Sequence, residues 1–310
     1  DAAFFAPFFE RTARDQAIRS AMVKALEREA NEPLDLQSLC DGVWRGLRRE
    51  GFRLYDRRNP EPMSTTAAKD RLTALIAAEV CGGALRVSLE SLGLATVGYE
   101  GAPAISRRVT ELLPAERQNL APALVRFLLD LIRHSRAINN LEVIDLTDES
   151  IWGEGQSSAE ISWSLTRTNA SRRLRTMLPE AGRPNRPLWL MVDQLGLSDA
   201  IARDILSAFW DEATRPRHRL LVPGGLGYVL NLAALRFTPA PEGHLWRCQS
   251  CGGMSQIDLD GACASWRCTG RTIMMPAIDR AEMRRRNHYL VRYTGTALSG
   301  VAREHTAAIG

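Results

Sequence analysis

The most informative stretch of this 310-residue sequence reads Cys248-Gln-Ser-Cys251-Gly-Gly, and it is completed by Cys263-Ala-Ser-Trp-Arg-Cys268-Thr-Gly270. Eleven residues separate the second cysteine from the third, which is enough chain for a hairpin between the two pairs. Tetrahedral zinc takes four thiolates at about 2.3 Å, and a short Cys-x2–4-Cys loop places two sulfurs on one edge of that tetrahedron. The spacing therefore predicts a zinc ribbon in which one ion is bound by Cys248, Cys251, Cys263 and Cys268.

This zinc is expected to be structural, because four protein ligands leave no position open for water or substrate. Two disulfide bonds are the alternative chemistry, which is disfavoured because the flanking sequence has no extracellular character. Gly252 and Gly270 are expected to take positive φ, so that the backbone folds back around the sulfurs. Trp246 and Trp266 each precede a cysteine by two residues, and we expect them to pack on the metal hairpins.

A strongly basic segment follows the cysteines. Residues 265–303 contain eight Arg and two acidic residues, a balance of +6, so the rest of the chain carries −2 of the total charge of +4. Arginines with interleaved tyrosines beside a zinc ribbon favour contact with nucleic acid. The alternative is a solvated arginine-rich helix face. The predicted nucleic-acid-binding residues are Arg271, Arg284, Arg285, Arg286, Tyr289 and Arg292.

The first 138 residues predict a helical domain. Apolar residues recur at three-and-four spacing in 10–30, after Asp35, after Ser64 or Thr65, and in 120–138. Asp35 and Ser64 are of the residue types that cap helix N-termini. Arg133 is expected on the polar side of the last helix, away from the core. Residues 88–99 predict a turn of helix that leads into a strand.

The remaining sequence completes an α+β chain that is mainly α with small β parts. We expect an irregular connection over 139–187, a winged-helix-like segment over 188–240, the zinc ribbon over 241–278 and a basic segment over 279–310. The winged-helix pattern is a helix from Ser198 followed by two strands, 219–222 and 227–232, around a tight turn. Such a layout binds nucleic acid in some proteins and serves as structural packing in others.

The sequence has no nucleotide-binding loop, since neither of its two lysines, Lys24 and Lys69, follows a glycine. The segment Asp148-Glu-Ser-Ile151 begins like the Asp-Glu box of helicases, but its last residue does not match that motif. We therefore expect a loop or a helix cap there. No apolar run approaches the roughly 18 residues of a membrane span. A cytoplasmic, reduced protein without a membrane partner is expected, and the start without Met suggests a piece of a longer chain.

Two C-terminal segments resemble motifs of a known family: Tyr289-Leu-Val-Arg-Tyr293 and Val301-Ala-Arg-Glu-His-Thr-Ala307. These motifs resemble very large bacterial DEAD/DEAH-box helicases of superfamily 2, including the anti-phage types of Druantia and DISARM. In that family an Arg-Glu-His-Thr-Ala signature, matched by Arg303, Glu304, His305, Thr306 and Ala307, lies where the second RecA-like domain begins. The stretch 88–94 and the segment before the cysteines are also similar to that family. Ala308-Ile309 departs from the expected Gln-Leu-like continuation.

The resemblance implies that the chain is a non-catalytic insert between two RecA-like domains. The parent would use ATP and Mg²⁺ to move on DNA in phage defence or DNA processing, whereas this chain should be inactive alone. Its implied partners are DNA, as single strand or duplex, and the flanking RecA-like domains of the same polypeptide. The alternative is a free-standing zinc-containing winged-helix regulator that binds DNA.

Overall fold

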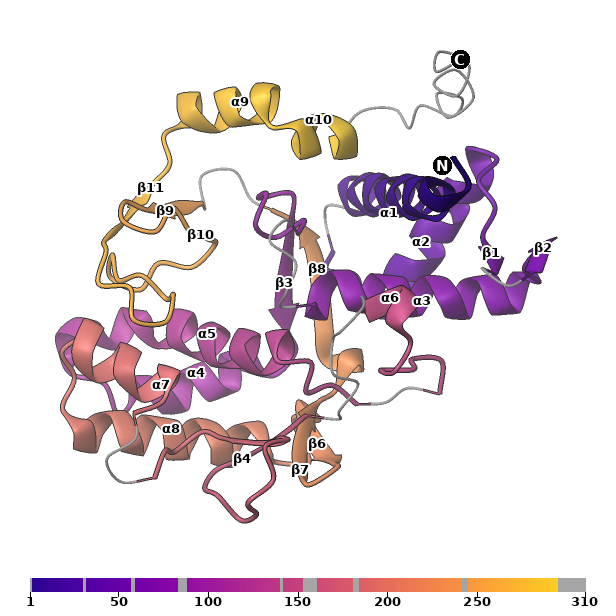
Figure 1. Cartoon of the computed structure of the whole chain (residues 1–310). Helices are drawn as coiled ribbons and strands as arrows, with labels where there is room; N and C mark the ends of the chain where they lie inside the picture. The colour runs from indigo at the N-terminus through magenta and orange to yellow at the C-terminus, as the bar shows by residue number, and fades with distance from the viewer. Residues whose placement is uncertain are drawn as a thin grey trace.

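A computed structural model describes residues 2–29, 32–56, 59–82, 88–139, 142–152, 161–180, 184–240 and 245–294. The chain has a mixed α/β fold in which helices predominate and the strands form small sheets (Figure 1). One continuous set of buried side chains runs from Ala17 in the first helix to Tyr293 in the last. No helix within these ranges combines the length and the apolar character that crossing a membrane requires.

Three N-terminal helices form as the sequence predicts: α1 (Ala2–Arg28), α2 (Leu36–Arg49) and α3 (Thr65–Cys81). The side chain of Asp35 accepts a hydrogen bond from the Ser38 N–H at 2.7 Å and caps α2. Ser64 caps α3 in the same way, which satisfies an N–H group that has no partner within the helix. A short hairpin of β1 (Tyr55–Asp56) and β2 (Asn59–Pro62) lies between α2 and α3.

The second helical group spans residues 102–134. It comprises α4 (Ala102–Thr110), the 3-10 turn η1 (Ala115–Leu120) and α5 (Ala121–His134). The predicted turn at residues 88–94 leads into β3 (Ala95–Tyr99), which pairs antiparallel with the distant β8 (Leu235–Pro239). This pairing joins the first third of the chain to the segment just before the cysteines.

Arg133 on α5 corrects the sequence prediction, because its side chain is fully buried rather than on the polar face. Its guanidinium contacts Glu90 at 2.7 Å and Asp130 at 2.8 Å, and its Nε donates to the Tyr99 hydroxyl at 2.8 Å. It also donates to the carbonyl of Val80. A buried charge is tolerated only when it is paired and hydrogen-bonded, and these partners come from four different segments.

A four-stranded sheet closes the other side of the fold, with strand order β5-β4-β7-β6. The predicted helix is α8 (Asp199–Ala213), and the predicted hairpin is β6 (Leu221–Gly224) with β7 (Gly227–Leu230). The segment 139–187 contributes two of the strands. The remaining elements here are α6 (Glu149–Trp152), β4 (Ser162–Ser164), β5 (Leu174–Thr176), α7 (Arg186–Trp189), the π-helical turn η2 (Leu190–Gln194) and η3 (Leu232–Ala234).

Two smaller sequence expectations are also met in this half. Trp210 of α8 packs edge-on against Tyr228 of β7, with ring centroids 5.6 Å apart, as supporting side chains would. Asp148 caps the short helix α6, because its carboxylate accepts a hydrogen bond from the Ser150 N–H at 2.9 Å. It also forms an ion pair with Arg71 of α3. The segment that begins like a helicase box therefore stabilises the fold at this position.

The cysteines belong to a small three-stranded antiparallel sheet, which we call the four-cysteine module (residues 245–275). Its order is β10 (Met254–Ser255), β9 (Trp246–Cys248), β11 (Thr272–Met274), with β9 in the middle. Two helices follow, α9 (Ala277–Arg286) and α10 (His288–Thr294). In Figure 1 they cross the top of the molecule, and α10 packs against α1.

Candidate metal centre

The four cysteines converge on one point of the module. All four Sγ atoms lie within 4.8 Å of one another. Two of the distances, Cys248–Cys268 and Cys251–Cys263, are 3.7 Å. A tetrahedron with metal–sulfur bonds of about 2.3 Å has edges of about 3.8 Å, so these separations suit one tetrahedral ion. No sulfur is bonded to another, since all four cysteines are free thiols.

Backbone turns on each side of the cluster bring the sulfurs together. Cys248 ends β9, and the N–H of Gly252 bonds back to its carbonyl at 3.0 Å. Gly252 takes φ +69°, as predicted, which is the left-handed region that glycine enters at least cost.

Gly270 does not have the positive φ that the sequence predicts. A glycine is needed at this position for a steric reason. A Cβ at this position would lie 2.7 Å from the Cys248 sulfur and 2.6 Å from the Ser250 Cβ. Glycine is needed here because the backbone itself approaches the sulfur cluster.

Backbone N–H groups point at the sulfurs and change their acidity. Those of Cys251 and Ser250 lower the pKa of the Cys248 thiol to about 6, whereas burial raises the pKa of Cys263 to about 12. The Ser265 N–H also donates to the Cys263 sulfur at 3.4 Å. Four thiolates this close would repel one another, so the cluster favours a bound divalent cation that neutralises them.

Gln256, which follows β10, fixes the module to the helical body. Its amide nitrogen donates to the carbonyls of Glu90 at 2.8 Å and Ala95 at 2.7 Å. Its amide oxygen accepts from the Thr96 hydroxyl at 2.7 Å and from Arg126 at 3.3 Å. Gln256 was not predicted as a contact residue, because a single glutamine in a loop has no distinguishing sequence pattern.

A second attachment involves the loop between Cys263 and Cys268. Trp266 packs edge-on against Trp189 of α7 with ring centroids 5.4 Å apart, and Arg186 donates to the carbonyl of Ala264 at 2.9 Å. The sequence predicts that Trp266 packs on the metal hairpins, whereas its ring partner is Trp189 of the body and the side chain stays 41% exposed. Because the module is held at two places, its orientation relative to the helices is fixed.

The predicted nucleic-acid-binding residues divide into two groups. The guanidinium of Arg271 lies over Gly261 within the module and donates to the carbonyl of Asp260 at 3.2 Å. The consecutive Arg284, Arg285 and Arg286 are exposed on α9, a helix with no buried residue.

The two tyrosines of α10, the helix that follows, differ in their exposure to solvent. Tyr289 is 43% exposed, whereas Tyr293 is buried and its hydroxyl accepts a hydrogen bond from Arg19 at 2.6 Å. Arg292 lies on α10, and its side chain lies outside the described residues. The family signature at Arg303, Glu304, His305 and Thr306 also lies outside the described residues.

The two remaining cysteines take no part in the cluster. Cys40 and Cys81 are buried in the helical half, and burial raises the pKa of Cys40 to about 11 and that of Cys81 to about 12. Buried thiols with raised pKa values are unreactive. Within the described residues, the metal-binding chemistry of cysteine is therefore concentrated in the module.

Comparisons with known proteins leave the chain without an assigned family. No family model, curated protein or solved structure matched it.

Proposed function

We propose that this chain is a zinc-stabilised, nucleic-acid-binding insert of a large ATP-dependent DNA helicase, active in phage defence or DNA processing. The observation that carries the proposal is the cluster of four thiols placed directly before an exposed run of arginines. The family resemblance supplies the parent enzyme, whose RecA-like domains would bind ATP and Mg²⁺. The chain itself would bind DNA and brace the motor.

Zinc is the proposed ion because the donor set is entirely sulfur. Soft thiolates select zinc among the abundant cellular divalent ions, and oxygen-seeking ions such as Mg²⁺ are disfavoured. With four ligands from the protein, the ion would hold the hairpins together and take no part in chemistry. Metal analysis should give one zinc per chain, and a variant carrying Cys248→Ser and Cys263→Ser should retain none. Full retention of metal by that variant would remove the basis of the proposal.

The arginines of α9 support contact with phosphates. Arg286 pairs with Glu282 at 2.8 Å, but the two side chains are 82% and 45% exposed, so the pair contributes little to stability. Met283 is the side chain of α9 that packs against the hydrophobic core, and this contact does not account for the three consecutive exposed arginines. Phosphate oxygens, which accept bidentate hydrogen bonds from guanidinium groups, are the partners that such a helix suits.

An exposed apolar edge beside α9 supports contact with a further protein surface. Ile273 and Met274 of the edge strand β11 are 49% and 56% exposed, and Ile278 at the start of α9 is 73% exposed. Apolar side chains and unpaired strand groups gathered at one edge are typical of a protein interface. In the proposed function this edge would face a flanking RecA-like domain of the parent polypeptide.

The proposal is tested by strand binding to the full chain. A labelled single strand should bind in a salt-dependent way, and changing Arg284, Arg285 and Arg286 together to Ala should weaken binding by at least tenfold at low salt. The control changes Arg108, Arg167 and Arg203 to Ala, each of which forms a surface ion pair. Equal binding by the two variants would refute a role for α9. The neighbouring coding sequence should also encode Walker-type motifs.

A free-standing DNA-binding regulator is the second candidate, favoured by the hairpin that follows α8. The tip residue Leu226 is 46% exposed, and the turn before it uses Gly225 at φ +59°. A winged-helix regulator would bind duplex DNA through this region with sequence preference. Loss of duplex binding on changing Leu226 to Asp, with strand binding by α9 unchanged, would favour the regulator over the helicase insert.

A further inference from the structure

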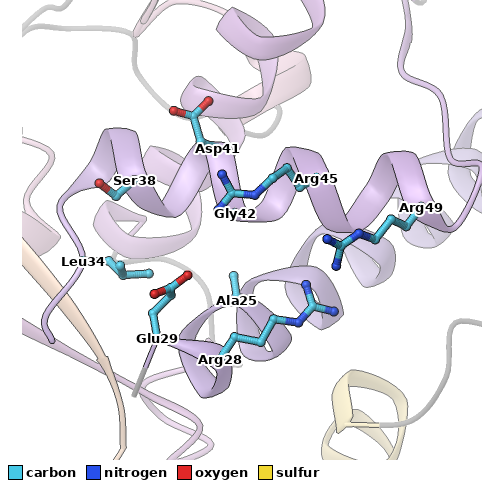
Figure 2. A pocket seen from close by; sticks show the side chains of 9 residues that line it. All are labelled: Ala25, Arg28, Glu29, Leu34, Ser38, Asp41, Gly42, Arg45 and Arg49. Atoms are coloured by element: carbon cyan, nitrogen blue, oxygen red, sulfur yellow. The ribbon is translucent and has the colours of Figure 1, made fainter. Parts of the chain in front are cut away.

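A groove of about 510 Å³ lies between α1 and α2, far from the cysteines in sequence (Figure 2). It exists because the two helices approach closely. A Cβ at Gly42 would lie 3.2 Å from the Cβ of Ala25, and one at Gly46 would lie 3.7 Å from that of Ala21. Small residues therefore form the floor, and longer side chains on each helix form the walls.

Three arginines line this groove: Arg28 in the last turn of α1, and Arg45 and Arg49 on α2. All three are exposed, and among the described residues none forms an ion pair. Figure 2 shows the guanidinium groups of Arg28 and Arg49 pointing toward one another from the two helices. Two exposed guanidinium groups that approach one another repel weakly in water, and together they attract anions.

The acidic residues of the groove do not neutralise the guanidinium groups of Arg28 and Arg49. Asp41 binds Lys69 at 2.8 Å and Gln37 at 3.2 Å, and these hydrogen bonds lower its pKa. Its charge is thus already compensated. Glu29 lies toward the end of the groove away from Arg28 and Arg49 in Figure 2. The groove is therefore positive at the end where the guanidinium groups of Arg28 and Arg49 lie, whereas Arg45 points toward Asp41 in Figure 2.

From this geometry we infer that the groove binds phosphate groups of a nucleic-acid strand. Guanidinium groups match phosphate in shape and charge. Arg45 and Arg49 lie one turn apart, about 6 Å along the helix, and the wall from Ser38 to Arg49 is roughly 16 Å long. The three arginines therefore suit neighbouring phosphates of one strand, whereas the rest of the groove is lined by Asp41 and Glu29.

The position of α1 connects this groove with α9 and α10. Arg19 of α1 donates to the Tyr293 hydroxyl at 2.6 Å and lies over its ring at 5.2 Å. The helix that carries Arg28 thus packs against α10, which directly follows the helix α9 that carries the consecutive arginines. The inference rests on the proposed nucleic-acid binding and adds a second contact region to it.

The test compares two triple variants of the full chain by fluorescence anisotropy with a labelled 20-nucleotide strand. The groove variant carries Arg28→Gln, Arg45→Gln and Arg49→Gln. The control variant carries Arg108→Gln, Arg167→Gln and Arg203→Gln, which removes the same charge from arginines that already have carboxylate partners. Because all six side chains lie at the surface, both variants should melt close to the parent.

The groove variant should bind the strand at least tenfold more weakly at low salt. Its slope of log affinity against log salt should be shallower by about 2, since a single strand releases about 0.7 counterion per phosphate contact. The control should change the slope by less than half as much. Identical behaviour of the two variants would overturn the groove inference while leaving the proposed function of α9 intact.

Two competition experiments, one with inorganic pyrophosphate and one with polyglutamate, identify the class of ligand. Inorganic pyrophosphate should compete with the strand only weakly. If pyrophosphate instead protects the parent against heat and the strand does not bind, the groove is a site for small phosphates and the strand inference is wrong. Competition by polyglutamate equal to that by an unlabelled strand would likewise overturn it. Loss of strand binding in the α9 variant with full binding in the groove variant would reject the groove alone.

Discussion

Changing Glu90 to Gln tests the buried network that joins the two halves of the helical body. The Glu90 carboxylate contacts Arg133 at 2.7 Å, Arg126 at 3.6 Å and His134 at 3.7 Å, all from α5. Its side chain is 17% exposed, and that of Arg133 is fully buried. The substitution keeps the shape of the side chain and removes one of the two carboxylates that pair with Arg133, the other being that of Asp130.

The size of the effect follows from the pKa of Glu90. Burial alone would raise this pKa, but the guanidinium of Arg133 and the hydrogen bonds of His134 and Arg133 lower it from 4.5 to about 2. At 1.36 kcal/mol per pH unit, the difference is worth on the order of 3 kcal/mol at neutral pH. Removing one partner of a buried pair costs roughly 3–5 kcal/mol in other proteins, which agrees.

The pH dependence gives a second, sharper expectation. Because the folded pKa lies below the unfolded one, the stabilisation is complete above pH 4.5 and is lost as the pH falls toward about 2. Urea unfolding from pH 7 to pH 3 should show the parent losing stability more steeply below pH 4.5 than the Glu90→Gln variant. The buried Glu79 is present in both proteins, so its own titration cancels in the comparison.

The matched control is Glu50→Gln, which removes the carboxylate of the surface pair with Lys24 at 2.6 Å. Such pairs contribute about 0–1 kcal/mol, so the control should lose no more than that. Equal losses from the two substitutions, or parallel pH curves for the parent and the Glu90→Gln variant, would refute the reasoning.

Three further changes test the module. Chelation of a bound metal should unfold residues 245–275 while most helical circular dichroism persists, because the module contributes only Leu259 and Ala262 to the buried core that the helices form; a single cooperative loss of all signal would contradict this. Gln256→Ala removes four hydrogen bonds of about 1 kcal/mol each, and it should speed amide exchange in the module with little change in metal content. Gly270→Ala should lower metal affinity at least tenfold, since its Cβ would overlap the Cys248 sulfur; unchanged affinity in a metal competition assay would contradict the close approach of this backbone to the sulfur.

Local sequence rules predicted the elements whose structure depends on neighbouring residues. The caps at Asp35 and Ser64, the hairpin around Gly225 and the cysteine cluster all follow from spacing and residue type within a short window. In each case the interaction that decides the conformation joins residues close in sequence. The same rules found the turn that leads into β3.

Features that depend on distant contacts were not predicted. Arg133 looks polar in a helical pattern, and only the approach of Glu90 and Tyr99 makes its burial favourable. Gly270 was expected to adopt positive φ, whereas its role depends on how near Cys248 lies in space. Both errors have the same cause: a sequence pattern records conformational preference, and it does not record which backbone or charge will lie beside a residue.

The turn at residues 88–94 links these unpredicted contacts to the module. The carboxylate of Glu90 pairs with the buried Arg133, and the carbonyl of the same residue accepts the amide of Gln256 from the module. A change that shifts this turn must therefore disturb both the helical core and the attachment of the cysteines. Since α9 continues directly from the module, the position of its arginines depends on the same turn. The buried charge network thus has a consequence beyond stability: it fixes where the proposed phosphate-binding helix stands relative to α1 and its groove.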